Sequence, residues 1–159
     1  MTFKSKRTLV SMAAGTALTA AYVIYALGGR APAPEDLRAW ALTMLVFIGI
    51  AVAASVVIQI LFHIAYSVGV AVRDRALSDK EVERIVEAET AEDEMDALVG
   101  LKSSRIGYAC SGIGFAAALV WLAFFGASAV TALHIMLGAV CAGSFAEGVI
   151  SIKLYERGV

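Results

Sequence analysis

The chain has 159 residues, of which 60% are hydrophobic, and its formal net charge is -1 at neutral pH. Typical soluble domains are about 45–50% apolar, and a soluble domain of this size has too small an interior to bury the excess. The composition therefore favours contact with lipid, and the near-neutral charge excludes the strong basic field that is typical of direct nucleic-acid binding.

The first apolar stretch covers residues 9–27 and follows three basic residues, Lys4, Lys6 and Arg7. A membrane-spanning helix needs roughly 20 predominantly apolar residues, which this stretch supplies. It is long for the hydrophobic core of a signal peptide, so we predict a first membrane span. Residues 28–34 contain two glycines and two prolines, which end the helix because they favour non-helical backbone or lack the amide donor.

The second apolar stretch covers residues 37–72 and is longer than a membrane crossing requires. The hydrocarbon core is roughly 30 Å thick, and a helix rises about 1.5 Å per residue. Asp36 is placed to cap this helix, and Trp40 is placed at the outer interface. We predict a span over residues 39–64, and we expect the rest of the apolar stretch to continue the same helix into the cytoplasm. A strong tilt of the helix in the membrane is the alternative.

Residues 73–105 form the strongly polar part of the chain. Ser78 followed by Glu81 has the form of a capping box, and a weaker version begins at Thr90. Apolar residues recur at helical spacing after each cap. We therefore predict a cytoplasmic hairpin of two short amphipathic helices, placed on the membrane surface or against the spans.

Two further spans are predicted at residues 106–126 and 130–152, and their short connection makes them antiparallel neighbours. The predicted fold class is all-α: an integral membrane four-helix bundle, in one membrane domain, with the hairpin between helices two and three. Small residues recur on both spans at helical spacing. They favour close packing within the chain, with a homo-oligomer interface as the alternative. These residues are Gly107, Ser111, Gly114, Ala118, Ala139, Gly143 and Ala146.

The placement of lysine and arginine predicts the orientation of the chain. Three of the 13 basic residues precede the first span, six lie between the second and third spans, and two follow the fourth. Only Arg30 and Arg38 lie on the other side. Because cytoplasmic loops carry the excess of basic residues, we predict a multi-pass protein of the cell membrane with both termini in the cytoplasm.

Polar residues within the spans indicate a possible site. Gln59 and His63 are four residues apart on the second span, Glu147 lies at similar depth on the fourth, and Tyr108 starts near that level on the third. Ionisable residues in a span are costly and tend to face the protein interior, and histidine changes charge near neutral pH. We predict that these four residues converge, to relay a proton or bind a cation. The alternative is structural pairing of Glu147 with Lys102, Arg105 or Lys153.

No motif of an enzyme occurs in the sequence, which contains neither a glycine-rich phosphate loop nor a His-Glu-x-x-His pattern. Cys110 and Cys141 lie in separate apolar runs without metal-ligand spacing, so we interpret them as small buried hydrophobic residues. We predict a non-enzymatic protein with neither a metal nor a cofactor.

The sequence from Asp93 through Glu94, Met95 and Asp96 to Arg105 resembles a family of small four-span membrane proteins of bacteria and archaea. That family carries an Asp-Glu-Arg-Asp signature ahead of its third span, and Met95 stands where the family has arginine. Its function is uncharacterised, and its members often look like partners of small helix-turn-helix regulators. The resemblance implies a membrane-anchored regulatory role, with Asp93, Glu94, Asp96 and Arg105 as the matching positions.

Two classes of function follow from these patterns. The first is a membrane-anchored interaction protein that recruits a cytoplasmic regulator, through residues of the signature and the basic positions after it. These residues are Asp93, Glu94, Asp96, Lys102 and Arg105. The alternative is a small transporter or channel that uses the intramembrane polar residues. Because four spans rarely enclose a pore alone, the alternative depends on a homo-oligomer in the lipid bilayer.

Overall fold

The computed structural model describes residues 3–73, 94–126 and 128–157. Within these residues the chain forms four α-helices: α1 (Phe3–Leu27), α2 (Leu37–Arg73), α4 (Glu94–Phe125) and α5 (Ala129–Arg157). All four are long and apolar enough to cross a membrane. The prediction of an all-α chain with four helices of membrane-spanning length is therefore confirmed.

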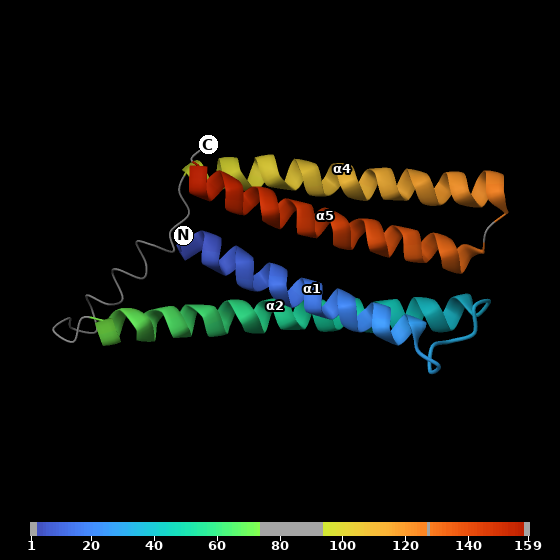
Figure 1. Ribbon diagram of the computed structural model, residues 1–159, viewed down its shortest axis with the longest axis horizontal. Helices are drawn as coiled ribbons and strands as arrows, with labels where there is room; N and C mark the ends of the chain where they lie inside the picture. Colours follow the sequence, from blue (N-terminus) through green and yellow to red (C-terminus); the bar gives the residue numbers. More distant parts are fainter. Residues whose placement is uncertain (1–2, 74–93, 127, 158–159) are drawn as a thin grey trace.

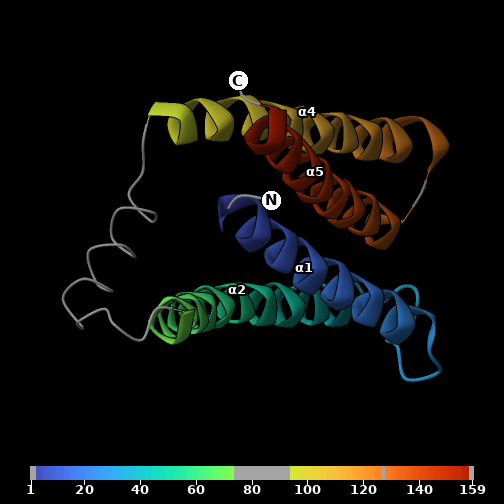
Figure 2. The same cartoon turned by 60° about the vertical axis from the view of Figure 1, so that its left-hand side comes forward.

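The helices lie in the spatial order α4, α5, α1, α2, and consecutive helices run antiparallel (Figure 1). Both chain termini lie at one end of the molecule, together with the end of α2 and the start of α4; we call this the terminal end. The opposite end holds the connections around residues 28–36 and 126–128, and we call it the loop end. Figure 2 shows α1 between the α4–α5 pair and α2.

The closest packing in the described residues is between α4 and α5, and it depends on glycine. A Cβ atom at Gly114 would overlap the Cβ atom of Ala139. A Cβ atom at Gly143 would lie 2.7 Å from the carbonyl oxygen of Gly107. Small residues allow membrane helices to approach closely, where van der Waals contacts replace the missing hydrophobic drive. The predicted small-residue packing within the chain is therefore confirmed.

The start of α4 differs from the prediction. The helix begins at Glu94 and continues without a break to Phe125, so residues 94–105 are not a separate short helix. Val99, Ser103 and Gly107 are buried at four-residue spacing, so one packed face crosses the predicted boundary and keeps the helix continuous. The first part of the predicted hairpin, with Asp93, lies outside the described residues.

The helix α2 is the peripheral element of the fold. It packs against α1 and makes few contacts with α5. It is continuous to Arg73, a length that fits both predicted alternatives, projection beyond the span and strong tilt. Large apolar side chains are exposed along its length, including Leu45, Val52 and Leu61, each more than half exposed. A surface of this kind on a helix of membrane-spanning length is suited to lipid.

Aromatic contacts join three helices at the loop end. The Trp40 side chain is buried, its Nε1 donates a hydrogen bond to the Ala33 carbonyl at 3.0 Å, and its ring meets that of His134 edge-on at 4.6 Å. Tyr22 contacts Phe47 in the same way, with ring centroids 5.1 Å apart. These contacts hold α1, α2 and α5 together at this end. They give His134 a structural role.

We expect the substitution Gly114→Ala to destabilise the protein by about 1–3 kcal/mol, because its methyl group would force α4 away from Ala139. The matched control is Gly112→Ala on the same helix, where a Cβ atom meets nothing within 4 Å. Thermal unfolding of both variants in mild detergent measures the difference. Equal melting temperatures would contradict the close α4–α5 contact.

Candidate functional site

A buried polar cluster joins three helices at the terminal end. Lys4 of α1 forms an ion pair with the Oδ2 atom of Asp96 in the first turn of α4. The Tyr155 hydroxyl of α5 donates a hydrogen bond to the other carboxylate oxygen at 3.0 Å. The Asp96 side chain is only 9% exposed, and Val99, one turn further along α4, is fully buried. Asp96 therefore organises the terminal end of the fold.

This cluster corrects one part of the sequence interpretation. The sequence placed Asp96 with Lys102 and Arg105 in one partner-binding set; the side chains of Lys102 and Arg105 are exposed, whereas Asp96 pairs with Lys4 inside the fold. Lys4 is 92 residues away in the chain, so no local pattern identifies the pair. Glu94 is exposed at the start of α4. Of the two signature acids that the structure describes, only Glu94 is open to an external partner.

Glu147 lies where α4 and α5 meet. Its Oε1 atom accepts a hydrogen bond from the Ser104 hydroxyl at 2.7 Å. Its Oε2 atom would lie 2.7 Å from a Cβ atom at Gly107, so the missing side chain there makes room for the carboxylate. The proposed pairing with a basic residue is replaced by this serine contact between neighbouring helices.

Of the four polar residues predicted to converge, Gln59 and Glu147 line one groove, whereas His63 and Tyr108 are not among its lining residues. Tyr108 is 78% exposed. The side-chain oxygen of Gln59 accepts a hydrogen bond from the Arg7 guanidinium at 3.3 Å, which joins α2 to α1. His63 takes no part in the lining of the groove to which Gln59 and Glu147 both contribute. At the terminal end α1 lies between α2 and the α4–α5 pair (Figure 2), so similar depth on these helices does not by itself place two residues in contact.

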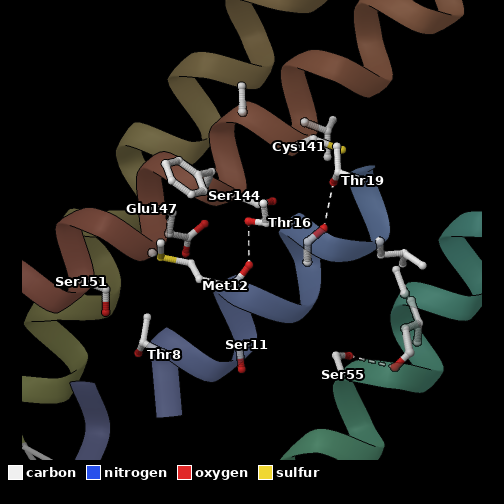
Figure 3. A pocket seen from close by; sticks show the side chains of 18 of the residues that line it. Thr8, Ser11, Met12, Thr16, Thr19, Ser55, Cys141, Ser144, Glu147 and Ser151 are labelled. Atoms are coloured by element: carbon white, nitrogen blue, oxygen red, sulfur yellow. Dashed lines mark hydrogen bonds between the residues drawn. The ribbon is translucent and has the colours of Figure 1, made fainter. Parts of the chain in front are cut away.

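A large groove runs along α1 between α2 and α5 and reaches the start of α4. Its volume is about 1580 Å³. Polar side chains from all four described helices line it among apolar ones, and Figure 3 shows those of α1, α2 and α5. The polar lining consists of Lys4, Arg7, Thr8, Ser11, Thr16, Thr19, Tyr22, Ser55, Gln59, Asp96, Ser103, Ser144, Glu147, Ser151 and Tyr155.

Several hydroxyl groups of the groove are satisfied by their own helix. Thr16 and Thr19 donate to the carbonyl oxygens four residues before them, at 2.8 and 2.9 Å, and Ser55 donates to Val52 at 2.8 Å (Figure 3). Such local bonds satisfy the donor of each hydroxyl within its own helix. The middle of the groove is therefore compatible with an apolar occupant. The α1 hydroxyls escaped the sequence interpretation, although Thr8, Thr16 and Thr19 recur near helical spacing.

The hydroxyl of Tyr22, which also lines the groove, differs from those that are bonded to their own helix. Its side chain is buried, and its hydroxyl is the one buried side-chain polar atom among the described residues without a hydrogen-bond partner. It lies near the loop end of the groove, beside the aromatic contacts that close it. Charged groups, by contrast, line the groove only in its terminal half.

Comparisons with protein-family models, curated proteins and solved structures found no match. Within the described residues, no group of three or more histidine, cysteine, aspartate or glutamate side chains is placed to hold a metal ion. Cys110 and Cys141, which the structure describes, are both unpaired thiols. The groove and the terminal-end cluster are therefore the features on which a functional proposal rests.

We expect Asp96→Asn to destabilise the protein by about 1.5–3 kcal/mol, since it removes the charge that holds Lys4. Glu94→Gln, an equal charge loss at an exposed position in the same turn, is the control and should have little effect. Chemical or thermal unfolding in detergent measures both variants. A double-mutant cycle with Lys4→Met should give a coupling energy; strict additivity would show that the ion pair has no energetic weight.

Proposed function

We propose that the chain is a multi-pass protein of the cell membrane with both termini in the cytoplasm. The four helices have the length and composition of membrane spans. Basic residues gather toward the terminal end, whereas Arg30 and Arg38 lie at the loop end. The excess of basic residues on one side supports a cytoplasmic terminal end.

We further propose that the protein is non-enzymatic and binds an amphipathic solute in the groove, as a small transporter or carrier does. The observation that supports this proposal is a groove of about 1580 Å³ within helices of membrane-spanning length, with charges at one end and self-bonded hydroxyls along it. Ligand sites are typically concave and mostly apolar, with a few placed polar groups. The groove has this character.

A water-filled channel is less well supported than a solute-binding groove. The hydroxyls at Thr16, Thr19 and Ser55 donate to their own backbone, so none of these three donors is left to bind a line of water molecules. One copy also leaves the groove open on one side, because α2 is held mainly by α1. A homo-oligomer remains our prediction for the closed assembly.

The groove proposal predicts that Ala142→Phe, which fills the groove from α5, weakens binding of the neutral apolar probe N-phenyl-1-naphthylamine. Ala117→Phe is the matched control, because Ala117 is equally exposed on α4 but lies outside the groove lining. Probe fluorescence is measured on both purified variants in the same detergent. The result expected is a loss of about tenfold or more in affinity for Ala142→Phe alone. Equal binding by both variants would contradict the groove as the binding site.

A second candidate function is recruitment of a cytoplasmic partner, and the outward face of α4 favours it. Glu94, Leu98, Leu101, Lys102 and Arg105 are all exposed on the first three turns of this helix. Exposed apolar side chains rimmed by charges are typical of a docking surface. Asp96 is excluded from this surface because it is bound inside the fold.

If that surface recruits a partner, Lys102→Glu together with Arg105→Glu should abolish copurification of a cytoplasmic protein with the tagged chain. Lys153→Glu together with Arg157→Glu, at the end of α5, controls for the same change of net charge. Mass spectrometry of the copurified proteins gives the result. An identical partner on both baits would exclude the α4 surface as its docking site.

A further inference from the structure

The two basic side chains at the terminal end of the groove have partners of different charge. Lys4 is held by the carboxylate of Asp96. Arg7, one turn further along α1, donates its hydrogen bond to Gln59, whose side-chain oxygen is neutral, at 3.3 Å. Among the described residues, no carboxylate forms an ion pair with Arg7. Both Arg7 and Gln59 line the groove.

The two acidic side chains of the groove are bonded to groups other than Arg7. Asp96 is bound by Lys4 and Tyr155. Glu147 turns toward α4, where Ser104 donates to it at 2.7 Å and Gly107 makes room for its second oxygen. The guanidinium of Arg7 and the amide of Gln59 together offer hydrogen-bond donors, and a guanidinium binds carboxylate and phosphate well.

Beyond Arg7 the groove suits a hydrocarbon chain. Its walls include Met12, Phe47 and Val52, and the hydroxyls of Thr16 and Thr19 are bonded to their own helix. The path along α1 from Arg7 to Tyr22 covers 15 residues, or about 22 Å at the helical rise of 1.5 Å per residue. That is more than half of the roughly 30 Å hydrocarbon core, so an acyl chain of one leaflet fits along it.

We infer that the groove binds an anionic amphiphile, whose carboxylate or phosphate group contacts Arg7 and Gln59 and whose acyl chain lies along α1. This inference rests on the proposed function and names the chemical class of its solute. The recognised chemistry is an anionic headgroup on a long chain. It is shared by a free fatty acid and by an anionic phospholipid of the surrounding membrane.

The test compares oleate with oleyl alcohol, which has the same chain without the charge. Native mass spectrometry of the purified full chain in neutral detergent measures the affinity for each. The wild type should bind oleate about tenfold or more tightly than oleyl alcohol, as expected for hydrogen bonds to a charged group. Arg7→Gln should abolish this preference, and Arg7→Lys should retain most of it.

Lys6→Gln is the matched control for Arg7→Gln. Lys6 is the adjacent basic residue, is exposed and lies outside the groove lining, so the two variants lose the same charge at neighbouring positions. Lys6→Gln should keep the preference for oleate. A preference that survives Arg7→Gln, or one lost equally in Lys6→Gln, would overturn the inference.

Competition distinguishes the two sources of the ligand. Displacement of oleate by phosphatidylglycerol, but not by phosphatidylcholine, would support the inference and identify membrane lipid as a source. Displacement by neither lipid, with oleate still preferred, would support it for a free fatty acid. Displacement by inorganic phosphate alone would overturn it, because phosphate has no chain.

The inference and the proposed function fail in different ways. If the wild type binds oleate and oleyl alcohol equally and Ala142→Phe weakens both, the anionic inference is overturned while the groove remains a binding site. If N-phenyl-1-naphthylamine and both amphiphiles bind Ala142→Phe as well as they bind the wild type, the groove itself is not the site, and both proposals are overturned.

Discussion

The close approach of α4 and α5 is the contact on which the rest of the structure depends. In lipid the hydrophobic effect does not drive helices together, so the backbones must come close enough for van der Waals contact to hold them. Glycine at positions 107, 114 and 143 makes this possible, since a side chain at any of them would meet the facing helix. The same closeness creates the space in which the Glu147 carboxylate is held.

The helix α1 packs against the α4–α5 pair through contacts of two kinds. Met12 of α1 occupies the space above Gly148, where a Cβ atom would overlap its thioether. At the terminal end, the ion pair of Lys4 with Asp96 and the hydrogen bond from Tyr155 connect α1, α4 and α5. A charged contact that is largely shielded from solvent is strongly directional, because a misplaced partner would leave a buried charge unpaired. It therefore determines how α1 lies against the α4–α5 pair.

The groove is a consequence of uneven packing. While α4, α5 and α1 are in close contact, α2 is held at the loop end by the aromatic contacts of Trp40 and Phe47 and near the terminal end by Gln59. Between these contacts its side chains do not fill the space beside α1. The result is an open slot of mostly apolar character with charges at one end. Such a slot matches an amphipathic molecule better than it matches a hydrated ion.

The terminal-end cluster also changes how the acidic signature is interpreted. The resemblance to small four-span proteins rests partly on Asp96, and this residue serves the fold of the chain itself. Its position in the first turn of α4 adds a favourable interaction with the positive end of the helix dipole. A role in partner recruitment therefore needs the exposed residues Glu94, Lys102 and Arg105 rather than Asp96.

The sequence by itself determined the helical class, the four apolar segments, the break after Leu27 and the small-residue contact of α4 with α5. It also determined the cap at Asp36, whose Oδ1 atom accepts a hydrogen bond from the backbone N–H of Ala39 at 2.9 Å. These features follow from composition and from spacing within one or two helices. Only the tertiary structure decided that α4 continues through residues 94–105, that Asp96 meets Lys4, and that Gln59 and Glu147 line one groove while Tyr108 is exposed. Each of these features depends on the spatial order of the helices. The periodicity of a single helix indicates how deep a residue lies and on which face of the helix, but it does not indicate which other helix packs against that face.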